Sequence, residues 1–350
     1  MKTKSFFAAA NGYSGFRSYF KEVFKPERFN RIFVIKGGPG TGKSTLMKNV
    51  ADFFRETADL TEKIYCSSDP NSLDGIILTK GTRKVALLDG TAPHETDAKI
   101  PGAVDKIINL GEFWDEENLK AHRTEILHLN KEKSSHYRYA YEYLRLAGIF
   151  DECILKKVKG AYKNSLKNVL EQICFERKEY RQKFENSTAL ISSYGKKGLV
   201  SLEKKNFEGK TNYTVKGIYG SENLFMQSLK NYLDVNELHY TVYPSPLSES
   251  IIEGIYIYEC DSFITTVFEY ESSIETDSLI DKEILETNAE FLTLCNEEKN
   301  RFLTLSKEEF EKASDNHFKL EKIYSSSINF SAHKVLIDDI LKDITKVLTD

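Results

Sequence analysis

Nine consecutive residues have the composition and spacing of a phosphate-binding loop. They are Gly37, Gly38, Pro39, Gly40, Thr41, Gly42, Lys43, Ser44 and Thr45. Glycines allow successive backbone N–H groups to turn towards one anion, and a helix that begins at the loop adds the partial positive charge of its N-terminus. In such loops the lysine reaches the β- and γ-phosphates of a nucleoside triphosphate, and the serine hydroxyl is a ligand of Mg²⁺. The loop therefore predicts a site for ATP and Mg²⁺, with Lys43 acting in catalysis and Ser44 as a metal ligand.

A carboxylate at the end of a later apolar run is the second candidate for this chemistry. Asp89 directly follows the run 85–88, and an aspartate at such a place can hold Mg²⁺ through water. We predict Asp89 as a metal ligand and catalytic residue. The next residue is Gly90, where many hydrolytic P-loop ATPases carry glutamate, so hydrolysis would need another base. His94 and Glu95 are candidates to orient water or to sense the γ-phosphate, and ordinary surface-loop residues are the alternative.

The residues around the loop predict the elements that must position it. Short apolar runs predict strands at 5–9, 32–36, 63–67, 75–78 and 85–88, and helical spacing predicts helices at 16–24 and 44–55. Strands that alternate with helices indicate an α/β fold with a parallel sheet covered on both faces. Ligands bind at the carboxyl ends of such strands, where Asp69 lies in a polar loop. Asp69 is a candidate metal partner or base, with a turn role as the alternative.

Three short segments recur in the same order in the second half of the chain. Residues 7–16 resemble 190–199, residues 33–37 resemble 213–217, and residues 73–76 resemble 252–255. The simplest organisation is a P-loop NTPase-like unit duplicated in tandem, each copy with an added helical segment; two unrelated α/β units are the alternative. The expected divisions are a P-loop domain at 1–115, a helical hairpin or bundle at 116–186 broken near Gly148 or Gly160, a degenerate P-loop-like domain at 187–278, and a helical segment at 279–350.

The two halves differ in the residues that would bind phosphate. Aligning Gly37 with Gly217 puts the run 222–224 (Glu-Asn-Leu) opposite the run 42–44 (Gly-Lys-Ser). The second loop then lacks the lysine and the hydroxyl, and it gains a carboxylate that would repel phosphate. The matching strand at 263–267 also ends without an aspartate. We therefore predict that the second site is degenerate and that only the N-terminal site holds nucleotide.

Composition excludes several classes of protein and ligand. The 350 residues include 49 lysines and arginines and 53 aspartates and glutamates, for a net charge of −4, which does not favour nucleic acid as a partner. No apolar run approaches the ~20 residues that span a bilayer. The five cysteines lack any CxxC pair and predict reduced thiols in a cytoplasmic protein. The long charged helical segments are the expected surface for a protein partner.

Four runs together resemble a little-characterised bacterial family of duplicated P-loop proteins that are labelled predicted ATPases. The runs are 36–48 (KGGPGTGKSTLMK), 65–77 (YCSSDPNSLDGII), 86–97 (ALLDGTAPHETD) and 101–115 (PGAVDKIINLGEFWD). The resemblance implies ATP binding at 37–45 and Asp89, and it implies no further substrate. Family members look as though they carry a phosphate loop in each half, and this chain departs from that pattern at 222–224.

Three functions fit these features. The first is a slow or regulated Mg²⁺-dependent ATPase that uses only the N-terminal site. The second is a small-molecule kinase, which needs no glutamate after Asp89 because it does not activate water. The third is a nucleotide sensor or scaffold that does not hydrolyse ATP, which a degenerate second half would suit.

Overall fold

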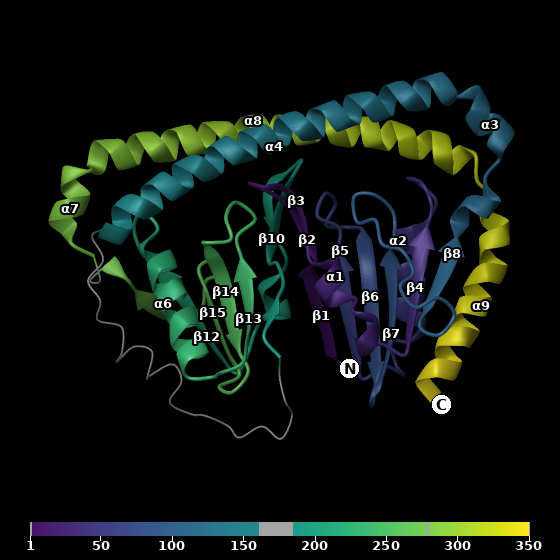
Figure 1. Ribbon diagram of the computed structural model, residues 1–350, viewed down its shortest axis with the longest axis horizontal. Coiled ribbons are helices and arrows are strands. Elements are labelled where there is room, and N and C mark those ends of the chain that lie inside the picture. The colour runs from purple at the N-terminus through teal and green to yellow at the C-terminus, as the bar shows by residue number, and fades with distance from the viewer. Residues whose placement is uncertain (1, 161–184, 278–279, 350) are drawn as a thin grey trace.

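Two α/β lobes lie side by side beneath a pair of long helices (Figure 1). The computed structural model describes residues 2–160, 185–277 and 280–349. Each lobe contains a six-stranded mixed sheet, and the order of the strands and the position of the main helix correspond in the two lobes. Within the described residues, no helix combines the length and the apolar character that crossing a membrane would require.

The sheet of the N-terminal lobe is mixed rather than parallel. Its order is β1-β5-β6-β7-β4-β8, and β6 runs antiparallel to both neighbours. The strands are β1 (Lys2–Phe7), β5 (Leu60–Tyr65), β6 (Leu73–Lys80), β7 (Arg83–Asp89), β4 (Arg31–Lys36) and β8 (Asp105–Asn109). The connection 66–72 is too short for a crossover, which needs about a dozen residues, and β6 turns directly into β7 at Gly81. The expected fully parallel sheet was therefore wrong at β6.

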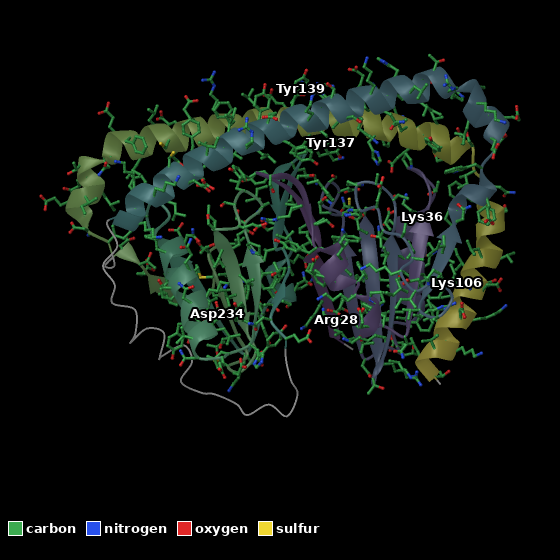
Figure 2. All side chains as sticks on the ribbon, in the orientation of Figure 1. Arg28, Lys36, Lys106, Tyr137, Tyr139 and Asp234 are labelled. Carbon is green, nitrogen blue, oxygen red and sulfur yellow. The ribbon has the colours of Figure 1, made fainter. Side chains whose placement is uncertain are left out.

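Helices cover both faces of this sheet. Phe33 and Ile35 of β4 face a core formed with α2 (Lys43–Phe53) and α9 (Phe330–Thr349). The alternate residues Ile32 and Val34 face the other side, where α1 (Phe20–Val23) and the 3-10 turn η1 (Pro26–Arg28) lie. The C-terminal helix α9 thus returns to the N-terminal lobe, and Lys106 beside it forms an ion pair with Asp343 at 2.7 Å (Figure 2).

The expected helix 16–24 is only partly correct. Its first residues form β3 (Gly15–Ser18), which pairs with β2 (Ala9–Gly12) in an antiparallel hairpin. The helix itself is limited to α1. Gly15 has a φ of +91°, a conformation suited to the turn of this hairpin rather than to a helix.

The C-terminal lobe repeats the strand order of the first. Its sheet is β16-β12-β15-β14-β13-β9, so β12 takes the place of β4, β15 that of β7, and β14 that of β6. The strands are β9 (Ser187–Thr188), β12 (Thr211–Lys216), β13 (Tyr240–Pro244), β14 (Ile252–Ile257), β15 (Ser262–Thr265) and β16 (Ser272–Glu275). The helix α6 (Ser221–Val235) corresponds to α2, and the hairpin of β10 (Ser192–Gly195) and β11 (Gly198–Ser201) corresponds to that of β2 and β3. The 3-10 turn η3 (Lys204–Asn206) follows this hairpin.

Two antiparallel helices, α4 (Arg123–Gly160) and α8 (Ala289–Ser326), run over both lobes; we call this pair the strap (Figure 1). Polar contacts hold the helices in register, including Ser306 Oγ to the Ala140 carbonyl at 3.0 Å and Lys299 to Asp151 at 3.0 Å. The shorter elements at its ends are η2 (Leu110–Phe113), α3 (Glu116–Ala121) and α7 (Lys282–Thr287).

The helical segment expected at 116–186 is described as far as Gly160, and residues 161–184 lie outside the described residues. The partner of α4 is α8, which comes from the end of the chain rather than from the same segment. Gly148 does not break α4. A Cβ atom at Gly148 would lie 2.4 Å from Cδ2 of Tyr13, so this glycine allows the β2–β3 hairpin to approach the strap.

Candidate functional site

The predicted phosphate loop, here called the phosphate loop, joins β4 to α2 at the end of the sheet that faces the strap (Figure 1). Gly40 and Gly42 have φ values of +67° and +82°, which favour glycine, and Gly42 is the residue that caps α2. The Thr41 hydroxyl donates to the Gly38 carbonyl at 2.9 Å and closes the loop on itself. The free N–H groups of the first turn of α2 therefore point into the loop, where they favour an anion.

Lys43 spans the mouth of the loop. Its Nζ donates to the carbonyls of Gly37 and Gly38 at 2.9 and 2.8 Å, and it lies 3.6 Å from Oδ2 of Asp89. Both charged side chains are only 14% exposed. The ammonium group is thus directed across the loop towards the end of the adjacent strand.

Asp89 is the last residue of β7, which pairs directly with β4. Its Oδ1 accepts hydrogen bonds from the backbone N–H of Thr91 at 2.9 Å and from the Thr91 hydroxyl at 2.5 Å. Burial raises the pKa of the Asp89 carboxyl above its usual range, although Lys43 and Thr91 act in the opposite direction. A cation close to Oδ2 would favour the ionised form.

Ser44 connects the loop to the antiparallel strand β6. Its Oγ accepts a hydrogen bond from the backbone N–H of Leu73 at 2.9 Å. A hydroxyl oxygen has two lone pairs, so one remains available to a metal ion. Thr45, the last residue of the predicted loop, is exposed on the first turn of α2.

Asp74 is a part of the site that sequence reasoning did not assign. It is buried next to Leu73 at the start of β6, and its charge contributes to the raised pKa of Asp89. Ser44 and Asp89 are the predicted ligands of Mg²⁺, and hydroxyl and carboxylate oxygens are the kind of ligand that this ion prefers. Within the described residues there is no group of three or more His, Cys, Asp or Glu that could hold a metal ion.

His94 and Glu95 occupy different environments. His94 is buried, stacks on Phe20 with ring centroids 4.2 Å apart, and places its Nε2 2.8 Å from Oδ2 of Asp74. It therefore contacts the site through Asp74. Glu95 is exposed to solvent.

The position after Asp89 has no room for a larger side chain. A Cβ atom at Gly90 would lie 2.5 Å from Cγ1 of Val34 and 2.9 Å from the Thr96 carbonyl oxygen. Lys36 holds this segment, because its Nζ donates to the Gly90 carbonyl at 2.8 Å (Figure 2). The chain therefore excludes a glutamate at this place sterically.

The loop 66–72 after β5 forms the wall next to the phosphate loop. Asp69 accepts a hydrogen bond from the Asn71 N–H at 3.1 Å, and this contact is the one expected of a residue that stabilises a turn. Lys48 of α2 donates to the Asn71 carbonyl at 2.6 Å, and the hydroxyl of Tyr137 on α4 donates to Ser68 Oγ at 3.2 Å. Tyr137 lies beneath the strap, whereas Tyr139 lies on its outer face (Figure 2).

The strap covers the phosphate loop directly. A Cβ atom at Gly40 would lie 2.6 Å from the carbonyl oxygen of Glu321 on α8. Similarly, a Cβ atom at Gly38 would lie 3.3 Å from the rings of Trp114 and Tyr324. No local pattern predicts this cover, because α8 is far from the loop along the chain.

The loop before α6 is one residue shorter than the sequence alignment predicts. Asn223 Oδ1 accepts from the N–H of Ile252, the first residue of β14, as Ser44 Oγ accepts from the N–H of Leu73, the first residue of β6. The core positions of the two helices agree with this register, which places Asn223 opposite Ser44 and Glu222 opposite Lys43. The alignment of Asn223 with Lys43 was therefore wrong.

The surroundings of Glu222 are acidic. Burial raises the pKa of Glu222, Asp151 and Asp277 add to the rise, and Lys299 opposes it. Lys299 is itself paired with Asp151. By strand register Thr266 takes the place of Asp89, so the C-terminal lobe lacks the lysine, the hydroxyl and the strand-end carboxylate.

Comparisons with family models, with curated proteins and with solved structures gave no match for this chain.

Proposed function

We propose that the N-terminal lobe binds Mg·ATP and hydrolyses it slowly or under regulation, and that the C-terminal lobe is a degenerate copy of the same P-loop unit. One observation carries this proposal. The Lys43 ammonium is held by the carbonyls of its own loop, at the start of a helix, and faces Asp89 on the adjacent strand. This arrangement offers backbone donors, a cation and a carboxylate around one small space.

Each group has a role in phosphoryl transfer. The loop N–H groups and Lys43 would stabilise charge on the β- and γ-phosphate oxygens. Ser44 and Asp89 would hold Mg²⁺, which neutralises charge on these oxygens when bound. In hydrolysis the water oxygen forms a bond to the γ-phosphorus as the bond to the β–γ bridging oxygen breaks.

We propose that the group that activates water lies near Asp74. His94 contacts Asp74 and is packed between Phe16 and Phe20, so we assign it a positioning role. The exposed Glu95 stays a candidate to orient water.

A nucleotide sensor that does not hydrolyse ATP is the second candidate. Gly90 leaves no space for the glutamate that many hydrolytic P-loop ATPases carry after the strand aspartate. The contact between Gly40 and Glu321 would couple an occupied loop to the strap. Tight ATP binding without release of phosphate would select this function.

The test compares Lys43→Ala with Glu222→Gln, which changes the corresponding residue of the other lobe. We expect Lys43→Ala to weaken Mg·ATP binding at least about tenfold, since it removes charge-assisted hydrogen bonds to phosphate. Glu222→Gln should leave binding within about twofold, because the C-terminal lobe holds no nucleotide. Calorimetric titration and phosphate release provide the readouts, and thermal unfolding verifies that each variant folds. Equal binding by Lys43→Ala and the wild type would contradict the proposal.

A further inference from the structure

Each lobe contacts the other through a β-hairpin. The β2–β3 hairpin of the N-terminal lobe contacts the C-terminal lobe, where the N–H of Tyr13 donates to the Pro246 carbonyl at 3.1 Å and Arg17 pairs with Glu249 at 3.2 Å. The β10–β11 hairpin of the C-terminal lobe contacts the N-terminal lobe, where a Cβ atom at Gly195 would lie 3.5 Å from the Ser68 carbonyl oxygen. Each hairpin thus meets the loop that follows the corresponding strand, β5 or β13, of the other lobe.

The turns of these two hairpins differ in charge. The turn that reaches the N-terminal lobe carries Lys196 and Lys197, both exposed. The turn that reaches the C-terminal lobe carries Tyr13 and Ser14, which have no charge. The turn that reaches the N-terminal lobe therefore carries two cations, whereas the turn that reaches the C-terminal lobe carries none and Arg17, on the strand β3 behind that turn, is paired with Glu249.

The basic turn is anchored next to the phosphate loop. Gly195 touches Ser68, whose hydroxyl is also the acceptor for Tyr137 of the strap. The same loop 66–72 is joined to α2 through Lys48 and leads directly to Leu73, the donor to Ser44. Hydrogen bonds between the lobes fix the hairpin itself, including Asn11 Nδ2 to the Tyr194 carbonyl at 2.7 Å.

Lys196 and Lys43 act on the same side chains of the strap. Burial lowers the pKa of His317, and Lys133, Lys43 and Lys196 lower it further. Burial and Asp69 raise the pKa of Glu321, while Lys43 and Lys196 oppose that rise. Both lysines therefore lie close enough to α8 to influence His317 and Glu321, and the loop itself meets α8 at Gly40, where a Cβ atom would lie 2.6 Å from the Glu321 carbonyl oxygen.

A third cation, from the strap, also influences His317. Lys133 of α4 is half-buried, and burial lowers the pKa of its ammonium group. Among the residues that the structure describes, none forms an ion pair or hydrogen bond with Lys133, and burial is the influence that lowers its pKa. A partly buried cation without a partner is costly, and a bound anion would remove that cost.

We propose that Lys196 and Lys133 bind the terminal phosphate of the nucleotide held by Lys43, so that the C-terminal lobe and the strap complete the site of the N-terminal lobe. This inference rests on the proposed function. It assigns a role to the degenerate lobe, which supplies a cation in place of a second active site. It also makes binding sensitive to the γ-phosphate, because Lys196 and Lys133 add positive charge at one end of the polyphosphate.

The experiment measures the affinities of Mg·ATP and Mg·ADP for Lys196→Ala, Lys196→Arg and Lys133→Ala, with Lys197→Ala as the matched control. We expect Lys196→Ala and Lys133→Ala each to weaken ATP binding about tenfold and ADP binding less than about twofold. Lys196→Arg should retain most of the preference for ATP, and Lys197→Ala should behave as the wild type. Thermal unfolding identifies any variant that fails to fold.

The outcomes separate this inference from the proposed function. If Lys43→Ala loses ATP but Lys196→Ala and Lys133→Ala keep the wild-type ratio of ATP to ADP affinity, the inference is overturned and the proposed function stands. Equal weakening of ATP and ADP, or an equal effect of Lys197→Ala, would also overturn the inference, because either shows only general attraction. Failure of the wild type to bind either nucleotide would overturn both.

Discussion

The loops that precede α2 and α6 lie at corresponding places in their lobes, yet the charged residues around them differ. Lys43 faces Asp89 at the first loop, and Lys133 and Lys196 influence the same residue of α8, His317, as Lys43 does. At the second loop Glu222 takes the place of the lysine, and Asp151 and Asp277 outnumber the one cation near it, Lys299. In both lobes a side chain at the start of the helix accepts a hydrogen bond from the first residue of the antiparallel strand, β6 or β14. The comparison shows that one backbone arrangement carries different charged side chains in the two lobes, and we propose that this difference decides which lobe attracts a polyanion.

The largest effect is expected from exchanging the charged residues at the start of the two helices. Lys43→Glu gives the N-terminal loop the carboxylate of the C-terminal loop, and like charges a few ångströms apart repel strongly in a partly buried site. We expect Mg·ATP affinity to fall more than about a hundredfold, beyond the loss for Lys43→Ala. Calorimetric titration measures the difference. The reciprocal Glu222→Lys should not create binding, because Asn223 and Thr266 still replace Ser44 and Asp89.

The strand-end carboxylate provides the next test. Asp89→Asn keeps the shape of the side chain but removes the charge that would hold Mg²⁺, so phosphate release should fall by about one to two orders of magnitude. Thr266→Val, at the corresponding place of the other lobe, should leave release within about twofold. Release measured over a range of Mg²⁺ concentrations checks the assignment. Unchanged Mg²⁺ dependence in Asp89→Asn would mean that another residue holds the metal.

A buried carboxyl distinguishes the lobes through pH. In the C-terminal lobe Glu253 occupies the position that Asp74 occupies in the N-terminal lobe. Asp74 is paired with His94, whereas Glu253 accepts a hydrogen bond from the Ser192 hydroxyl at 2.5 Å. Burial raises the pKa of Glu253 from 4.5 to about 7. Between about pH 4.5 and 7 the carboxyl is therefore protonated in the folded chain and ionised in the unfolded chain. The free energy of unfolding should fall as the pH rises through this interval, by on the order of 2 kcal/mol in total.

Glu253→Gln should remove this pH dependence, since an amide does not titrate. Thermal unfolding of the two proteins between pH 4.5 and 8 makes the comparison, with Glu259→Gln as a control for a partly buried carboxylate that is paired with His239. A wild-type unfolding temperature that stays level or rises over this interval would contradict a protonated Glu253.

The smallest expected difference concerns the cover over the loop. Gly40 and Gly220 both have positive φ, so alanine at either position strains the backbone by about 1 kcal/mol. A Cβ atom at Gly40 would also meet the Glu321 carbonyl at 2.6 Å, whereas nothing lies within 4 Å of a Cβ atom at Gly220. Gly40→Ala should therefore lower the free energy of unfolding by about 1 kcal/mol more than Gly220→Ala. Equal losses would show that α8 does not press on the loop.

Local sequence patterns predicted the elements that position the loop. The run 31–36 is apolar enough to form a buried strand, and the glycines and Lys43 follow it directly, so strand, loop and helix could all be read from neighbouring residues. The antiparallel course of β6 was missed, although the short connection 66–72 carries the signal. The register of α6 was missed because a one-residue shortening of a loop leaves no trace in the pattern of apolar residues.

The residues that complete the site could not be predicted from local patterns. Glu321 belongs to the strap, and only the folded chain brings its carbonyl to the loop at Gly40. Lys133 and Lys196, which we propose complete the site, likewise come from the strap and from the other lobe. Two exposed lysines in a hairpin turn look like ordinary surface residues in the sequence. The difference in charge becomes evident only when this turn is compared with the uncharged turn of Tyr13 and Ser14 in the equivalent hairpin.

The number of nucleotides bound per chain tests the opposite character of the lobes most directly. At a Mg·ATP concentration close to the Kd of the wild type, equilibrium dialysis should show much lower occupancy for Lys43→Ala than for the wild type and Glu222→Gln, which should both approach one nucleotide per chain as the concentration rises. Two nucleotides per wild-type chain, or wild-type occupancy in Lys43→Ala at every concentration, would contradict the account.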